Sequence, residues 1–144
     1  MAEILCSVVV DGDPTTVFDY VCDSDLHSLW QRDLRREKPA PNMVTGSRWT
    51  ELRRVGTREL RIDVTVTDSN RPERIEYVGE SGGFSGEGVI EFHAQGTQTR
   101  IVQRAKVRGR GIRAALAPVV ARQAQRVIQA DLFRLTFRFA RVAK

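Results

Sequence analysis

The chain has 144 residues, a length at which one hydrophobic core buries about two thirds of the surface of the unfolded chain. With 41% hydrophobic and 28% charged residues it is neither disordered nor collagen-like, and we expect one folded domain over residues 1–144. The net charge is +5, from 20 arginines and three lysines against 18 acidic residues. A positive net charge is compatible with an anionic partner, but the distribution of the charge along the chain is more informative than the total.

Local composition excludes several classes of protein. The chain has no run of 18 apolar residues, and its first residues lack the basic and apolar regions of a secretory signal, so we predict a cytoplasmic protein without a membrane span. Cys6 and Cys22 are the only cysteines and His27 and His93 the only histidines, and they lack the spacing of a metal site. We therefore expect two buried thiols, no metal and no cofactor.

The first thirty residues predict a strand followed by two short helices. Residues 4–10 are apolar and β-branched, as in a strand. Asp13 and Pro14 then supply an N-cap and a first helical residue, and apolar residues follow at helical spacing over 17–22. A second cap, Asp-Ser-Asp, predicts another short helix that runs to Trp30.

The middle of the chain predicts antiparallel strands. Residues 31–46 are polar and hold at most one edge strand, and from residue 47 onward the hydrophobic period is two. We expect a tight connection at residues 55–56, with Arg54 paired to Thr57, and a turn at 68–72. In that register the inner face of the sheet carries Trp49, Glu51, Leu60, Ile62, Val64 and Val66.

Five of the eleven glycines fall within residues 79–88. A strand follows them rather than a helix, which argues against a phosphate-binding loop. Gly82 and Gly83 are predicted to turn a hairpin. Gly86 and Gly88 share the inner face with Ile75, Tyr77, Ile90 and Phe92, and the next strand adds Ile101, Gln103, Ala105 and Val107. At the two inner glycines the missing side chains either allow a helix to approach closely or leave room for a ligand.

The last segment predicts one long amphipathic helix. Its apolar stripe consists of Leu116, Val120, Val127, Ile128, Leu132, Leu135 and Phe139. Pro118 lies inside this pattern, so the helix either starts or kinks there. From Val119 onward it would run about 24 residues, or about 36 Å at 1.5 Å per residue. Such a helix has to be covered by the antiparallel sheet, which predicts an α+β fold.

This order of elements and four stretches of sequence resemble the SRPBCC superfamily, which includes START lipid-transfer domains and the major birch pollen allergen. The stretches are "DPTTVFDYVCDSDLHSLW" (13–30), "TGSRW" (45–49), "GEGVIEFHAQGTQTRI" (86–101) and "LAPVVARQAQRVIQADLFRL" (116–135). More narrowly, the chain resembles the polyketide cyclase/dehydrase and lipid-transport group.

The resemblance implies a helix-grip fold. A curved antiparallel sheet of six to seven strands would wrap around the long C-terminal helix, with two short helices after the first strand. It also implies a cavity between sheet and helix that holds a hydrophobic or amphipathic small molecule, such as a lipid or polyketide. From the composition we expect a monomer or homodimer. It does not imply catalysis, because fold does not determine function.

The candidate ligand-cavity residues are those that the strand and helix patterns place inside: Trp30, Trp49, Glu51, Ile62, Val64, Tyr77, Phe84, Gly86, Gly88, Ile90, Phe92, Gln103, Val120 and Ile128. The aromatic members either line a pocket or fill a dry core. Gln103 either orients a ligand carbonyl or satisfies a neighbouring hydroxyl.

Glu51 and Tyr77 are the candidate catalytic residues, since a general acid or base needs a titratable group on the inner face. If the register is off by one residue, Glu51 is solvated instead. Asp131 on the long helix is a further candidate for the inner face, with a surface ion pair to Arg134, three residues on, as the default explanation. His27 is placed near the rim of the cavity.

Three functions follow as hypotheses. The first is a non-catalytic binding or carrier protein for a hydrophobic ligand, and the second is a cyclase/dehydrase-type enzyme. The third is a regulatory protein that uses a basic loop at 106–113 against an acidic partner or nucleic acid. Nucleic acid is not the expected partner, because no helix-turn-helix, zinc-finger or RNP pattern accompanies the loop.

Overall fold

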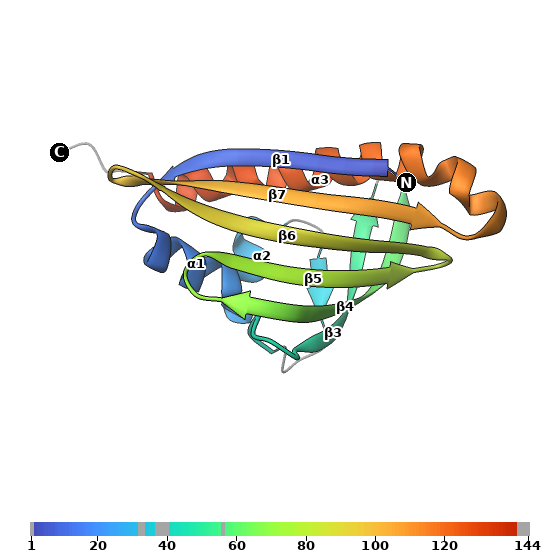
Figure 1. Ribbon diagram of the computed structural model, residues 1–144, viewed down its shortest axis with the longest axis horizontal. Coiled ribbons are helices and arrows are strands. Elements are labelled where there is room, and N and C mark those ends of the chain that lie inside the picture. Colours follow the sequence, from blue (N-terminus) through green and yellow to red (C-terminus); the bar gives the residue numbers. More distant parts are fainter. Residues whose placement is uncertain (1, 32–33, 37–40, 56, 141–144) are drawn as a thin grey trace.

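The computed structural model describes residues 2–31, 34–36, 41–55 and 57–140. Within them, seven strands form one curved antiparallel sheet in the order β1-β7-β6-β5-β4-β3-β2 (Figure 1). The strands are β1 (Ala2–Asp11), β2 (Leu34–Arg36), β3 (Arg48–Val55), β4 (Arg58–Asn70), β5 (Arg74–Ser81), β6 (Phe84–Gln95) and β7 (Gln98–Gly109). The predicted helix-grip sheet of six to seven strands is confirmed.

The helices also follow the predicted order. They are α1 (Pro14–Cys22), the 3₁₀ turn η1 (Ser24–Leu26), α2 (His27–Trp30), the 3₁₀ turn η2 (Gly111–Leu116) and α3 (Ala117–Arg138). In Figure 1, α3 runs behind β1 and β7, while α1 and α2 lie at the end of the sheet where β1 leads into α1. The long C-terminal helix and the two short helices after the first strand are as expected.

Capping residues explain where the helices begin. Asp13 Oδ1 accepts a hydrogen bond from the Thr16 amide at 2.7 Å, and Pro14 occupies the first position of α1. Pro118 lies in the first turn of α3, so the helix starts there and does not kink. Leu116 was expected in the buried stripe, but it ends η2 and is 52% exposed, because a 3₁₀ turn does not continue the α-helical period.

The predicted register of β3 and β4 is wrong by two residues. Val55 pairs with Arg58, so that Glu51 lies opposite Ile62 rather than Leu60. A shift of two residues preserves which face each side chain occupies, and the inner face is therefore unchanged. β4 also runs on to Asn70, past the start of the predicted turn at 68–72, after a register shift between Val66 and Asp68. Gly56 lies outside the described residues.

Glycines turn the β5–β6 hairpin as predicted. Gly82 and Gly83 have φ angles of +53° and +87°, and Ser81 pairs with Phe84 across them. Two consecutive positive φ angles are the signature of the tight hairpin turn that glycine permits without strain.

Helix α3 covers one edge of the sheet. It packs against β1 and β7, where Leu132, Leu135 and Ile101 are fully buried. Gln129 binds the backbone of Ser7 in both directions, accepting from its N–H at 3.3 Å and donating to its carbonyl at 2.9 Å. Gln125 accepts from the amide of Leu5 at 3.4 Å. These glutamines satisfy backbone groups on the free edge of β1, which would otherwise be open to another strand.

Candidate functional site

The candidate cavity residues fall into two groups on the inner surface. Buried are Trp30, Val64, Ile90 and Phe92. Half-buried are Trp49, Glu51, Ile62, Tyr77, Phe84, Gly86, Gly88, Gln103, Val120 and Ile128. The second group lies on β3 to β7 and in the apolar stripe of α3, and the helix makes few contacts with β4, β5 and β6. The side chains in this part of the inner surface therefore keep some exposure to solvent.

The two inner glycines have different surroundings. A Cβ on Gly88 would lie 2.5 Å from the hydroxyl and Cζ of Tyr77, so the tyrosine ring occupies the space over this glycine. A Cβ on Gly86 would meet only the Lys106 carbonyl, at 3.5 Å. Protein therefore fills the space over Gly88, and the space over Gly86 is open.

Tyr77 is held in place by Gln103. The Gln103 amide donates a hydrogen bond to the Tyr77 hydroxyl at 2.7 Å, so the glutamine satisfies a neighbouring hydroxyl, one of the two roles considered for it. Burial raises the pKa of Tyr77 to about 12, and the charge of Glu51 acts in the same direction. At neutral pH the phenol therefore keeps its proton and can donate a hydrogen bond but cannot act as a base.

Glu51 lies on the inner face and is half-buried. Its carboxylate accepts a hydrogen bond from the indole N–H of Trp49 at 3.3 Å. The two residues are neighbours on one face of β3 because side chains alternate along a strand. Glu51, Tyr77 and Gln103 thus belong to one polar group on an otherwise apolar surface.

A buried ion cluster is the polar feature that the sequence reasoning missed. Arg53, 7% exposed on β3, donates to the carboxylate of Asp131, 3% exposed on α3. Arg134 donates to the same carboxylate at 2.6 Å and to the carbonyl of Trp30 at 3.1 Å. The expected Asp131–Arg134 pair forms, but the expectation that it lies on the surface is wrong.

Two sequence signals indicate that Arg53 and Asp131 each lie on the inner side. Arg53 lies two residues after Glu51 and so shares its face of β3, and Asp131 falls beside Ile128, Leu132 and Leu135 in the apolar stripe of the helix. Burial raises the pKa of Asp131, and the guanidinium groups of Arg53 and Arg134 act in the opposite direction. The Asp131 carboxylate joins β3 to α3, and Arg134 links the cluster to the end of α2.

The Arg53 side chain has one donor to spare. Its Nε is buried and has no hydrogen-bond partner among the described residues. A buried donor without a partner is costly, and the oxygen of a ligand or a water would relieve that cost. The cluster thus holds one buried donor that no described side chain satisfies.

His27 does not lie at an open rim. It is 2% exposed, its Nε2 lies 2.7 Å from the carbonyl oxygen of Val21, and its ring meets that of Trp30 edge to face at 5.8 Å between centroids. Its position is that of a packed core residue.

The basic segment 106–113 is not a loop. Residues 106–109 form the end of β7, and η2 begins at Gly111. On the outer face, Arg108 lies 3.6 Å from Glu87. The neighbouring strand β6 thus places an acidic residue beside the basic residues at the end of β7.

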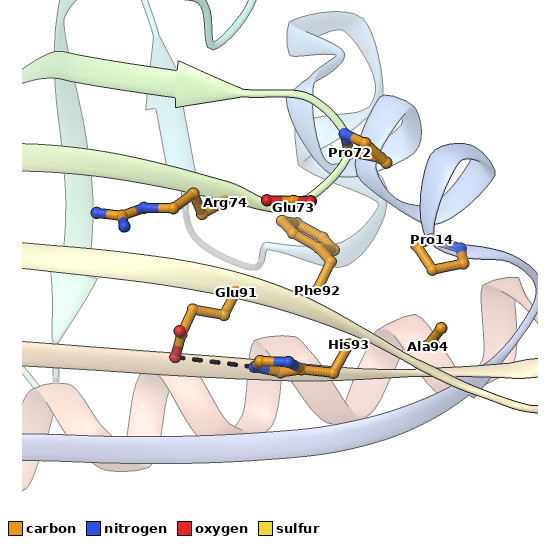
Figure 2. A pocket seen from close by; sticks show the side chains of 8 residues that line it. All are labelled: Pro14, Pro72, Glu73, Arg74, Glu91, Phe92, His93 and Ala94. Carbon is orange, nitrogen blue, oxygen red and sulfur yellow. Dashed lines mark ion pairs between the residues drawn. The ribbon is translucent and has the colours of Figure 1, made fainter.

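A pocket that the sequence did not indicate opens at one end of the sheet (Figure 2). It has a volume of about 500 Å³ and is lined by Pro14, Pro72, Glu73, Arg74, Glu91, Phe92, His93 and Ala94. Of these only Phe92 was a cavity candidate. Glu91 lies 3.9 Å from His93 and 3.3 Å from Arg104, so its charge is already engaged. The pocket forms where strands β5 and β6 come close to the start of α1. No local sequence pattern predicts that these three elements lie together.

A second, smaller pocket of about 270 Å³ lies between the start of β1 and the start of α3. In the part of the chain that the structure describes, no three metal-ligating side chains come together, and no helix has the length and apolar character needed to cross a membrane.

No curated protein matches the sequence. A protein from Thermus thermophilus has 18% identity and a TM-score of 0.74, with 95% of this chain and 96% of that chain covered. A conserved protein from Geobacillus kaustophilus has 17% identity and a TM-score of 0.73, with coverage of 96% and 95%. A START superfamily protein from Mycobacterium smegmatis has 13% identity and a TM-score of 0.75, with coverage of 96% and 97%.

At these identities the structural matches establish the fold alone. The family is established by sequence, because residues 1–139 match the family model described as polyketide cyclase / dehydrase and lipid transport. With nearly the whole chain covered, this protein belongs to the polyketide cyclase / dehydrase and lipid transport family.

Proposed function

We propose that this protein binds a hydrophobic or amphipathic small molecule against the half-buried inner surface of β3 to β6 and acts as a carrier rather than as a catalyst. The observation that carries the proposal is the apolar inner surface that α3 leaves uncovered. Trp49, Ile62 and Phe84 on the sheet and Val120 and Ile128 on the helix are all half-buried. Ligand sites are mostly apolar, with a few polar groups that orient the ligand.

The polar groups favour a ligand that carries an acceptor oxygen. Among the described residues the Nε of buried Arg53 has no acceptor, and Tyr77 keeps its proton at neutral pH, so both groups are potential donors. An amphipathic molecule with a carboxylate or carbonyl at one end matches an apolar surface with donors at its border. A carrier role is supported because Tyr77 is protonated and Arg53 is held by Asp131, which leaves little capacity for proton transfer.

The direct test is native mass spectrometry of the protein purified without denaturation. We expect an adduct that organic extraction removes. Dodecanoate added to the extracted protein should quench or shift the fluorescence of Trp49 and bind at least tenfold more tightly than dodecanol. An extracted protein that binds neither compound would contradict the proposal.

A substitution at the open glycine makes the test specific. A Cβ on Gly86 makes only an ordinary van der Waals contact, so the protein should tolerate a side chain there. Gly86→Leu should then fill the space over that glycine and lower the affinity for dodecanoate at least tenfold. Glu87→Leu is the matched control, because it adds the same side chain to the exposed face of the same strand. If both variants lose affinity equally, the ligand does not occupy the inner surface.

An enzyme of the cyclase/dehydrase type is the second candidate function, and it rests on Glu51. This carboxylate lies on the inner face close enough to contribute to the raised pKa of Tyr77. In an enzyme of this type Glu51 would move protons on the bound molecule, so Glu51→Gln should abolish turnover of a polyketide-type substrate and leave binding intact. A variant that turns substrate over at the original rate would remove this candidate.

A further inference from the structure

The positive charge of the chain is concentrated in one segment. Residues 106–130 contain six of the 23 basic residues and none of the 18 acidic ones. The rest of the chain is therefore close to neutral, although arginines occur along its whole length. A field of one sign on one part of a protein attracts an anionic partner.

The same segment exposes aliphatic side chains. Ile112 is 89% exposed, and Leu116 and Val119 are each 52% exposed. They lie where β7 ends and η2 leads into α3, at the far right of Figure 1. Single exposed apolar residues are common, but three within eight residues at one tip need an explanation.

The tip is held in position by the β5–β6 hairpin. The amide of Arg110 donates to the carbonyl of Gly83 at 3.0 Å, and the stem of Arg113 packs over the same glycine. The exposed side chains therefore project from a supported turn.

The arginines at this tip are available to a partner. Arg110, Arg113 and Arg122 are exposed, and among the described residues none of them forms an ion pair. Lys106 differs, because it lies in register between Glu3 and Glu87 on the outer face of the sheet. The basic character is thus strongest at the tip and is reduced along the strand.

We propose that this tip docks on an anionic lipid surface. The docking tip consists of Arg110, Ile112, Arg113, Leu116, Val119 and Arg122. Aliphatic side chains partition into the boundary between headgroups and acyl chains, while arginines bind the lipid phosphates. A nucleic acid would use the arginines but offers nothing for Ile112, the most exposed aliphatic residue, so a lipid surface explains more of the tip.

The docking tip adjoins the open part of the inner surface. Phe84 begins β6 directly after the hairpin turn that supports the tip, and Val120 follows Val119 on α3; both are half-buried inside. A docked protein would therefore present the uncovered inner surface near the lipid headgroups. Docking goes beyond ligand binding, since a protein can bind a small molecule without touching a membrane.

Vesicle binding tests the proposal directly. The protein should sediment with vesicles made of phosphatidylglycerol and phosphatidylcholine in equal amounts, but not with phosphatidylcholine alone, and added salt should weaken the binding. Arg110→Gln/Arg122→Gln should lower the affinity about 25-fold, at about fivefold for each charge removed. Ile112→Ser should also lower it, because that side chain would otherwise enter the lipid.

Matched controls separate docking from net charge and from folding. Arg61→Gln/Arg100→Gln removes the same charge from exposed positions on the outer face of the sheet, and Val44→Ser replaces an exposed aliphatic residue elsewhere. Both should bind vesicles as the parent does, and circular dichroism should show that every variant is folded. Equal losses in the control variants, or no binding of the parent to anionic vesicles at low salt, would overturn the proposal. Binding to duplex DNA or single-stranded RNA would also overturn the proposal if it is tighter than binding to vesicles, requires Arg110 and Arg122, and is unaffected by Ile112→Ser.

Discussion

The two halves of the inner surface differ in how helix α3 meets them. Along β1 and β7 the helix lies close, and Leu132, Leu135 and Ile101 are fully buried. Over β4 to β6 the inner side chains of Ile62 and Tyr77 stay half-buried. The closely packed half therefore contributes most of the buried area, while the less covered half is the surface that we propose for a ligand, because its side chains are not fully packed by the rest of the protein.

The largest expected effect lies at the border between the halves, in the ion cluster. Asp131→Ala should lower the free energy of unfolding by about 3 to 5 kcal/mol, because it leaves buried Arg53 without its carboxylate. Arg53→Met/Asp131→Leu should recover much of this loss, since Arg134 is partly exposed and can reach solvent. Urea unfolding of the parent, Asp131→Ala and the double variant measures these differences in the free energy of unfolding. A double variant as unstable as Asp131→Ala would contradict the expected recovery.

Two truncations in the apolar stripe of α3 compare a fully buried side chain with a half-buried one. Leu135→Ala should cost about 2 to 5 kcal/mol, because it removes a fully buried side chain and leaves a cavity. Ile128→Ala, two turns earlier in the same stripe, should cost about 1 kcal/mol, since less area is lost from the interior. Equal losses in urea unfolding would show that the helix is packed alike at both positions.

The two inner glycines offer a finer comparison within the open half. Gly88→Ala should destabilise by about 1 to 3 kcal/mol, because the new methyl group would displace the Tyr77 ring. Gly86→Ala should leave stability unchanged or raise it by up to about 1 kcal/mol, as alanine restricts the unfolded chain and meets only ordinary contacts. Thermal unfolding distinguishes them, and a Gly86 variant as unstable as the Gly88 variant would contradict the open space.

At neutral pH the smallest expected effect is that of Tyr77, which appears only as a pH dependence at high pH. Its pKa is raised from 10.0 to about 12, so between these values the folded protein holds a proton that the unfolded chain releases. The stability from this group is therefore complete below pH 10 and is lost as the pH rises toward 12. Tyr77→Phe should remove this slope from a series of urea curves, while a slope that persists in the variant belongs to another group.

Much of the fold was predictable because it depends on local periodicity. The alternation in β4, the cap at Asp13 and the glycine pair at 82–83 each encode their structure within a few residues. The inner faces were predicted even though the register of β3 and β4 was wrong, since an error of two residues leaves every side chain on its own face. Leu116 was misplaced because an α-helical period was extended into a 3₁₀ turn.

The site depended on relations between distant parts of the chain. Arg53 and Asp131 are 78 residues apart, and nothing local to either one predicts a partner on the other element. The same limit applies to the space over the glycines, where Tyr77 fills one position and leaves the other open. Periodicity determines which way a side chain points, whereas its burial and its partner depend on how closely α3 approaches each strand, which is decided only when the sheet closes around the helix.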